Sequence, residues 1–147
     1  MADRTSSSTT VAAPPGAVLA VIADVHAYPE WNGEIKSVEV LETVPDGSPR
    51  EARFSIASSG MNDDYVLRYD WTDDGVSWQL VAPSALQKTQ VGSYHLVPVE
   101  GGTEVRYDLQ IEARIPMIGL MRRKIEQRIV AAALQQLKSR VEGLSAS

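Results

Sequence analysis

The sequence predicts an α+β fold in which an antiparallel β-sheet is covered by one long C-terminal helix. Three observations lead to this prediction. Segments of alternating apolar and polar residues, separated by turn residues, follow one another from Ile35 to Ala113, as is typical of an antiparallel meander. A single segment, Pro116 to Leu144, has the length and composition of a long helix. Two brief helical segments lie between a first strand and this meander.

The composition is that of one domain. The chain has 147 residues and a mass of 16.0 kDa, with 44% hydrophobic and 22% charged residues, so it can bury a core of its own. We therefore expect residues 1–147 to form a single domain. The chain has no apolar run of about 18 residues, and residues 1–10 are too polar for a signal peptide. We expect no membrane span and a cytoplasmic location.

Residue types that carry much of enzyme chemistry are scarce. The chain has no cysteine and only two histidines, His26 and His95. This composition excludes a disulfide framework, a thiol nucleophile and a thiolate metal site, and it leaves little basis for a histidine-rich metal site. No glycine-rich phosphate loop is present. We therefore expect neither a metal ion nor another cofactor.

Charge is distributed unevenly along the chain. The formal net charge is −5, but residues 112–147 carry seven Lys and Arg against three acids, whereas residues 1–111 carry seven against sixteen. A basic helix on an acidic body can dock on an anionic surface. Alternatively, its cations occupy the solvent side of an amphipathic helix. Both interpretations stay open on sequence grounds.

The N-terminal part contains three short segments. Arg4 to Ala12 alternates weakly and is rich in Ser and Thr, which suits an edge strand or a loose tail. Pro14-Pro15 ends this segment, and Ala17 to Ala23 is predicted as a short apolar helix. Asp24 to Asn32 is predicted as a turn or a second short helix.

About six strands follow, separated by turn residues such as Pro45-Asp46-Gly47 and Glu100-Gly101-Gly102. The last strand is the clearest, because Val105, Tyr107 and Leu109 alternate strictly with polar residues. This alternation predicts a sheet with one dry face and one wet face. Only Ile35 to Val44 fits neither parity, which indicates a β-bulge.

The predicted dry face of the sheet is rich in aromatic residues. Alternation along the strands places the following side chains on it: Phe54, Tyr65, Tyr69, Trp71, Trp78, Tyr94 and Tyr107. Tyr and Trp have large rings with polar tips, unlike the Val, Ile and Leu of a plainly packed core. The long helix is the element that remains to cover this face.

The apolar stripe of the long helix changes face along its length. At about 100° per residue, the apolar residues of the first half and those of the second half gather on different faces. The first group is Met117, Met121, Ile125, Ile129 and Ala132, and the second is Val130, Ala133, Leu134, Leu137, Val141 and Leu144. We therefore expect the helix to contact a packed sheet at one end and different surroundings, such as a cavity, at the other.

The order of these elements resembles the helix-grip fold of the START-like (SRPBCC) superfamily, in which a curved antiparallel sheet wraps around the C-terminal helix. More narrowly, several stretches are similar to the bacterial polyketide cyclase/dehydrase-like group. They are Val18 to Asn32 (VLAVIADVHAYPEWN), the Asp74 to Trp78 turn, Gly92 to Leu96 with Gly102 to Tyr107, and the helix start at Ile115-Pro116. The similarity covers nearly the whole chain. These motifs are structural, so they imply the fold and leave the activity open.

The resemblance implies a deep cavity between the sheet and the N-terminal part of the last helix, used for a hydrophobic or polycyclic small molecule. The residues expected to bind it are the aromatic residues of the dry face, with Met117, Met121 and Ile125 from the helix and Trp31 near the entrance. In the alternative interpretation, these side chains simply fill a closed core.

No catalytic set can be assigned from the sequence. Cyclisation of a polyketide needs a positioned acid or base, and tyrosine, with an ordinary pKa of about 10, is a poor base near neutral pH. His95 is predicted on the outer face, and His26 in the turn that borders the mouth, where a surface or capping role suits it. Asp63-Asp64 and Asp73-Asp74 are interpreted as turn residues.

Three functions remain. The first is binding of a lipid or polyketide-like molecule, and the second is a polyketide aromatase/cyclase or dehydratase that uses cavity tyrosines as acids. The third is a ribosome- or protein-directed interaction module, as in toxins among the relatives, with Arg122-Arg123-Lys124 and Arg128 as its footprint. A pI near 5.0 disfavours the third function, and DNA is not an expected partner. Whether the protein forms a homodimer stays open.

Overall fold

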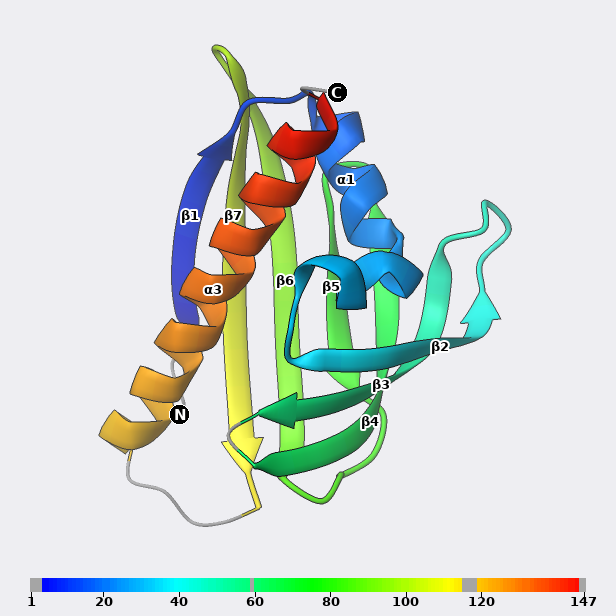
Figure 1. The fold of residues 1–147 in the computed structure, drawn as a ribbon, viewed down its shortest axis with the longest axis vertical. Coiled ribbons are helices and arrows are strands. Elements are labelled where there is room, and N and C mark those ends of the chain that lie inside the picture. Colours follow the sequence, from blue (N-terminus) through cyan, green and yellow to red (C-terminus); the bar gives the residue numbers. More distant parts are fainter. Residues whose placement is uncertain (1–3, 59, 115–118, 146–147) are drawn as a thin grey trace.

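A computed structural model of the chain describes residues 4–58, 60–114 and 119–145. The described part contains one antiparallel sheet, two short helices with a 3₁₀ turn between them, and one long helix (Figure 1). In chain order the elements are β1 (Thr5–Val11), α1 (Pro15–Ala23), η1 (Val25–Ala27), α2 (Tyr28–Trp31), β2 (Ile35–Thr43), β3 (Pro49–Ser58), β4 (Met61–Thr72), β5 (Gly75–Leu80), β6 (Gln87–Val99), β7 (Gly102–Ala113) and α3 (Gly119–Ser145).

The sheet has seven strands in the order β1-β7-β6-β5-β4-β3-β2. Strands β2 to β7 form the predicted meander. Strand β1 pairs with the last of them, β7, along its whole length, from Thr5 opposite Leu109 to Val11 opposite Thr103. Of the two alternatives left open for this segment, an edge strand and a loose tail, the structure has the edge strand. Two edges remain open, at β1 and at β2.

Turn chemistry agrees with the predicted strand boundaries. Gly47 and Gly101 have φ angles of 94° and 84°, a region that residues with a Cβ rarely occupy. They lie in the predicted turns between β2 and β3 and between β6 and β7. The predicted bulge is also confirmed, because the pairing of β2 with β3 shifts register between Val40 and Glu42.

Helix α3 crosses the sheet diagonally over β1 and β7, and its C-terminal end lies beside α1 (Figure 1). Its buried apolar side chains are Val130, Leu134, Leu137 and Val141. They share one core with apolar residues of the sheet and of α1, such as Val105, Leu109 and Ile22. The prediction that the second half of the helix packs on the sheet is confirmed. The predicted helix start at Pro116, together with Met117, lies outside the described residues.

Candidate ligand cavity and its polar chain

A cavity of about 100 Å³ lies between the inner face of the sheet and the short N-terminal helices. Most of its wall is aromatic and comes from β3 to β7, and one side is closed by α1 and α2. The lining side chains are Ile22, Tyr28, Ile35, Phe54, Tyr65, Leu67, Tyr69, Trp78, Gln90, Tyr94 and Tyr107. The alternating pattern of the strands therefore brings residues that are far apart in the sequence to one place.

Six of the predicted site residues line this cavity: Phe54, Tyr65, Tyr69, Trp78, Tyr94 and Tyr107. Two other predicted residues stand behind the wall. Trp71 stacks on Tyr69 with 5.6 Å between ring centroids, and its indole nitrogen donates a 2.6 Å hydrogen bond to the carbonyl oxygen of Pro49. Trp31 packs edge-on against Tyr28 at 5.0 Å. These two residues support the wall without lining the cavity.

The expectation that Met121 and Ile125 line the cavity was wrong. Their side chains are 52% and 42% exposed, and neither contributes to the cavity wall. The reason is the orientation of α3. The helix buries the face that carries Val130 and Leu137, and Met121 and Ile125 lie more than about 100° around the helix from that face.

Ring contacts join the aromatic residues of the wall into one cluster. The closest pair is Tyr94 with Tyr107, with ring centroids 4.7 Å apart and ring planes at 64°. Trp78 contacts both of these rings and also Tyr69. Such edge-on and tilted contacts stabilise aromatic pairs by about 0.5–1.5 kcal/mol beyond the burial of their area. The rings of the wall therefore support one another.

The tyrosine hydroxyls differ in their partners. Tyr28 donates to the carbonyl oxygen of Ile22, but the hydroxyls of the other four cavity tyrosines form no hydrogen bond with any described residue. These four are Tyr65, Tyr69, Tyr94 and Tyr107. Their oxygen atoms are accessible to water, because among the described side chains only the indole nitrogen of Trp31 is fully buried without a partner. Water or the polar groups of a ligand can therefore satisfy these hydroxyls.

Burial raises the pKa of every tyrosine in the chain. Loss of solvation is the largest cause in each case, and neighbouring tyrosines or carboxylates add to it. The cavity tyrosines are therefore neutral phenols at physiological pH. They can donate and accept hydrogen bonds, but they cannot act as phenolate bases.

A buried chain of polar side chains leads from β4 to the cavity. The Asp63 carboxylate, only 4% exposed, accepts hydrogen bonds from the Ser84 hydroxyl at 2.6 Å, the Ala85 amide at 3.2 Å and the Gln87 side-chain amide at 3.3 Å. Gln87 in turn accepts a 2.7 Å hydrogen bond from the side-chain amide of Gln90. Every member of the chain is buried.

The charge at one end of this chain orients the amide at the other end. Because the Asp63 carboxylate only accepts hydrogen bonds, Gln87 must turn its NH₂ group toward it and its oxygen toward Gln90. The NH₂ group of Gln90 therefore points to Gln87, and its Oε1 accepts the indole N–H of Trp78 at 3.0 Å. The orientation of the one amide in the cavity wall is thus specified from outside the cavity.

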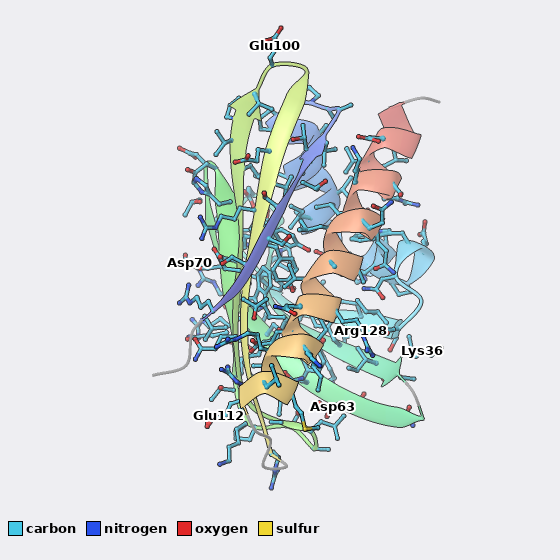
Figure 2. All side chains as sticks on the ribbon, turned by 90° about the vertical axis from the view of Figure 1, so that its left-hand side faces the viewer. Lys36, Asp63, Asp70, Glu100, Glu112 and Arg128 are labelled. Carbon is cyan, nitrogen blue, oxygen red and sulfur yellow. The ribbon has the colours of Figure 1, made fainter. Side chains whose placement is uncertain are left out.

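The interpretation of Asp63 as a turn residue was wrong. It lies within β4, paired with Ile56 of β3, and Figure 2 shows it at the lower end of the molecule. Its neighbour Asp64 is exposed, as alternation requires. The polar partners are Ser84 and Ala85, between β5 and β6, and Gln87 at the start of β6. They lie more than twenty residues away in sequence, so no local pattern marks the residue. Asp73-Asp74 form a turn as predicted.

Glycine at position 92 makes room for the indole of Trp78. The two residues are paired directly across β5 and β6. A Cβ built on Gly92 would lie 2.4 Å from the Cζ2 atom of Trp78, closer than any normal contact. A glycine inside a strand often marks such a close approach. Gly92 was therefore the signal in the sequence that another group approaches the strand closely at this position.

A second buried carboxylate, Glu126, connects α3 to the sheet. It is 1% exposed, and it accepts hydrogen bonds from the Ile111 amide at 2.6 Å and the Thr5 hydroxyl at 2.7 Å. The Arg122 guanidinium pairs with it at 3.3 Å. Sequence reasoning did not single out Glu126, although it lies four residues before the buried Val130, on the same helical face.

The remaining polar candidates are at the surface. His26 and His95 are exposed, and His95 lies 3.7 Å from the Asp74 carboxylate; its predicted outer position is confirmed. Within residues 4–58, 60–114 and 119–145, no cluster of His, Asp and Glu has an arrangement suited to a metal ion. Among the described helices, none is long and apolar enough to cross a membrane.

The fold and the cavity define the class of protein: a helix-grip domain of the START superfamily. The family model described as polyketide cyclase / dehydrase and lipid transport matches residues 2–142, so the chain belongs to that family. No curated protein sequence matches the chain.

Solved structures show the same fold. A START superfamily protein from Mycobacterium smegmatis is 25% identical, with a TM-score of 0.89 over 97% of this chain and 99% of that one. The Zhui aromatase/cyclase from a Streptomyces species is 17% identical, with a TM-score of 0.78 over 95% and 93% of the two chains. A STAR-related lipid transfer protein from Xanthomonas axonopodis is 15% identical, with a TM-score of 0.67 over 92% and 84%.

Proposed function

We propose that this protein binds a small molecule that has an apolar, ring-containing body and several oxygen atoms, and that the site is the aromatic cavity. The observation that carries the proposal is the set of four cavity tyrosine hydroxyls without a protein partner. The family description and the relatives named for lipid transfer and for aromatase/cyclase activity support small-molecule binding in general.

The hydroxyls argue for an oxygenated ligand over a plain hydrocarbon chain. When a ligand displaces water from the cavity, each hydroxyl left without a hydrogen bond costs about 1–3 kcal/mol by mutational data. A ligand with phenol, ketone or carboxyl oxygens satisfies several of them at once, whereas a saturated acyl chain leaves them unpaired. The amide of Gln90, held in one orientation, adds a fixed polar group to the same wall.

The size of the cavity sets a condition on binding. A volume of about 100 Å³ is smaller than the apolar cavity of about 150 Å³ that is known to hold benzene in an engineered protein. Ligand sites for larger molecules are usually about 300–1,000 Å³. Binding of any ring compound therefore requires cavity side chains to move apart.

The proposal can be tested with the protein as purified. Native mass spectrometry reports any bound mass, and tryptophan fluorescence follows titration with 2-naphthol and, as a matched hydrocarbon, with naphthalene. We expect 2-naphthol to bind more tightly than naphthalene. Replacing Tyr69 and Tyr107 with Phe should remove that preference and leave naphthalene binding unchanged.

A substitution on the exposed face of the sheet, away from the cavity, supplies the control. Gln79 lies on the outer face of β5, so Gln79→Leu should leave both titrations as in the parent protein. No bound mass in the purified protein, together with no change of fluorescence with either compound, would rule the proposal out.

Cyclisation of a polyketide is the second candidate, because neutral phenols can stabilise an enolate oxygen by hydrogen bonding. The wall of the cavity offers such donors but no titratable base. If the protein is a cyclase, a poly-β-ketone substrate should give a different product distribution with the protein than without it, and the Tyr69→Phe, Tyr107→Phe variant should lose the difference. If the parent protein does not change the product distribution, the cyclase function is excluded and small-molecule binding remains.

A further inference from the structure

The first half of α3 presents an amphipathic face that is not buried against the core formed by the described residues. Met121, Lys124, Ile125 and Arg128 follow the spacing i, i+3, i+4, i+7, so they lie on one side of the helix. All four are exposed, Met121 by 52% and Ile125 by 42%. We call these four residues the outer face of α3. Leu120, 61% exposed, lies beside it.

The outer face does not serve the stability of the domain. About half of each apolar side chain remains in water, so part of the stabilisation of about 1.5–3 kcal/mol that full burial of such a side chain gives is not used. Lys124 and Arg128 form no ion pair with any described residue. From Gly119 to Ile129 the helix has four cations and one carboxylate.

No carboxylate accompanies the cations on the outer face. The N-terminal end of a helix carries a partial positive charge that acts within its first turn, where acids would strengthen the helix. No acid is present in the first turn of α3. The one carboxylate nearby, Glu126, is buried against the sheet and does not reach the outer face. This arrangement makes sense when the partner outside is negatively charged.

We propose that the outer face of α3 docks on a membrane surface that contains anionic lipids. Exposed apolar side chains that alternate with Lys and Arg on one helical face are characteristic of helices lying in the lipid–water interface. The charges attract anionic headgroups, and the apolar side chains enter the boundary of the acyl chains. A polyanion such as RNA would use the cations but would gain little from Met121 and Ile125.

The charge of the whole molecule agrees with a single docking face. The net charge is −5, so most of the surface is repelled by an anionic membrane. Figure 2 shows Arg128 projecting from α3 on the same side of the view as Lys36, whereas Asp70 and Glu112 lie on the other side. Docking through the outer face would turn those acids away from the lipid.

The experiment measures co-sedimentation of the full chain with phosphatidylcholine vesicles with and without phosphatidylglycerol. We expect binding only to the vesicles that contain phosphatidylglycerol. Reversing two charges, with Lys124→Glu and Arg128→Glu, should lower binding at least about tenfold, because each basic residue near an anionic surface contributes about 1 kcal/mol. Met121→Ser with Ile125→Ser should also lower it several-fold.

A matched control removes apolar surface from the opposite end of the molecule. Val97 and Val99 are 38% and 39% exposed at the end of β6, near the β6–β7 turn that Figure 1 shows far from the first half of α3. Val97→Ser with Val99→Ser should bind vesicles like the parent. Circular dichroism and urea unfolding establish that each variant is folded.

Three results would overturn the proposal. They are no binding to either vesicle, equal loss of binding in the Val97/Val99 control, and binding that depends on Lys124 and Arg128 but not on Met121 and Ile125. The last result, with displacement by RNA, would assign the outer face to a polyanion. Vesicle docking needs no occupied cavity, so this test and the 2-naphthol titration can fail independently.

Discussion

The indole nitrogen of Trp78 donates a hydrogen bond of 3.0 Å to Oε1 of Gln90, and both side chains are buried in the cavity wall. Through Gln87 this contact continues to the Asp63 carboxylate. The cavity therefore has one polar group whose direction is set by a buried charge. This hydrogen bond can be tested by substitutions that affect either its acceptor or its donor.

The first prediction concerns the acceptor. Gln90→Leu leaves the Trp78 N–H and the Gln87 oxygen without partners, and each unsatisfied buried group costs about 1–3 kcal/mol. The free energy of unfolding, measured by urea denaturation, should fall accordingly. Gln79→Leu, on the exposed face of β5, is the matched control and should change little. Equal effects of the two substitutions would show that the buried amide has no special role.

The second prediction concerns the space that Trp78 occupies. Gly92→Ala places a methyl group 2.4 Å from the indole ring, so the ring must move and its hydrogen bond to Gln90 must break. Overpacking of this kind costs about 1–3 kcal/mol. Tryptophan fluorescence should shift to the red as the indole meets water. Gly33→Ala, where no atom lies within 4 Å of the new carbon, should leave the spectrum unchanged.

The third prediction contrasts the two halves of α3. Leu137 is fully buried, and Leu137→Ala should lower the free energy of unfolding by about 2–5 kcal/mol. Met121 is half-exposed, so Met121→Ala should change it by less than about 0.5 kcal/mol. Chemical denaturation of both variants provides the comparison. Similar losses would mean that the first half of the helix is packed in solution.

The fourth prediction concerns the buried carboxylate of α3. Glu126→Ala leaves the Ile111 amide and the Thr5 hydroxyl without their acceptor, and removal of one partner from a buried charged pair costs about 3–5 kcal/mol. Hydrogen exchange should also become faster in the first half of α3. Glu112→Ala, an exposed carboxylate at the end of β7, is the control. No change in exchange at α3 would contradict the role of Glu126 as the connection to the sheet.

The fifth prediction concerns alkaline pH. Burial raises the pKa of all five tyrosines, so the folded protein keeps phenol protons that the unfolded chain releases above about pH 10. The stabilising effect is fully present below that pH and is lost above it, by up to about 1.4 kcal/mol per pH unit for each tyrosine.

Absorbance of tyrosinate and far-ultraviolet circular dichroism, followed together, test this expectation. Tyrosine ionisation should coincide with loss of secondary structure, because the phenols ionise only when the chain unfolds. The Tyr69→Phe, Tyr107→Phe variant should show a shallower dependence on pH. Ionisation near pH 10 in a protein that keeps its circular dichroism would contradict the burial of the rings.

Local patterns were sufficient for the strands, the turns and much of the cavity wall. Alternation along β4 to β7 has a period of two residues, so it specifies the inner face of each strand without knowledge of its neighbours. Tyr69, Trp78 and Tyr107 were therefore placed on the inner face correctly. The turns at Gly47 and Gly101 were marked by residues that tolerate a positive φ.

Long-range contacts decided the rest. Asp63 is buried because Ser84 and Gln87 reach it from another segment, and Glu126 is buried because β1 and β7 supply its donors. The periodicity of α3 showed two apolar faces, and the face of the second half was correctly predicted to pack on the sheet; the surroundings of the other face were not. By itself, the sequence determined the fold class and the inner face of the sheet, since these depend on local periodicity. Only the tertiary structure decided that Met121 and Ile125 face outward, because the packing of α3 on β1 and β7 sets the rotation of the helix.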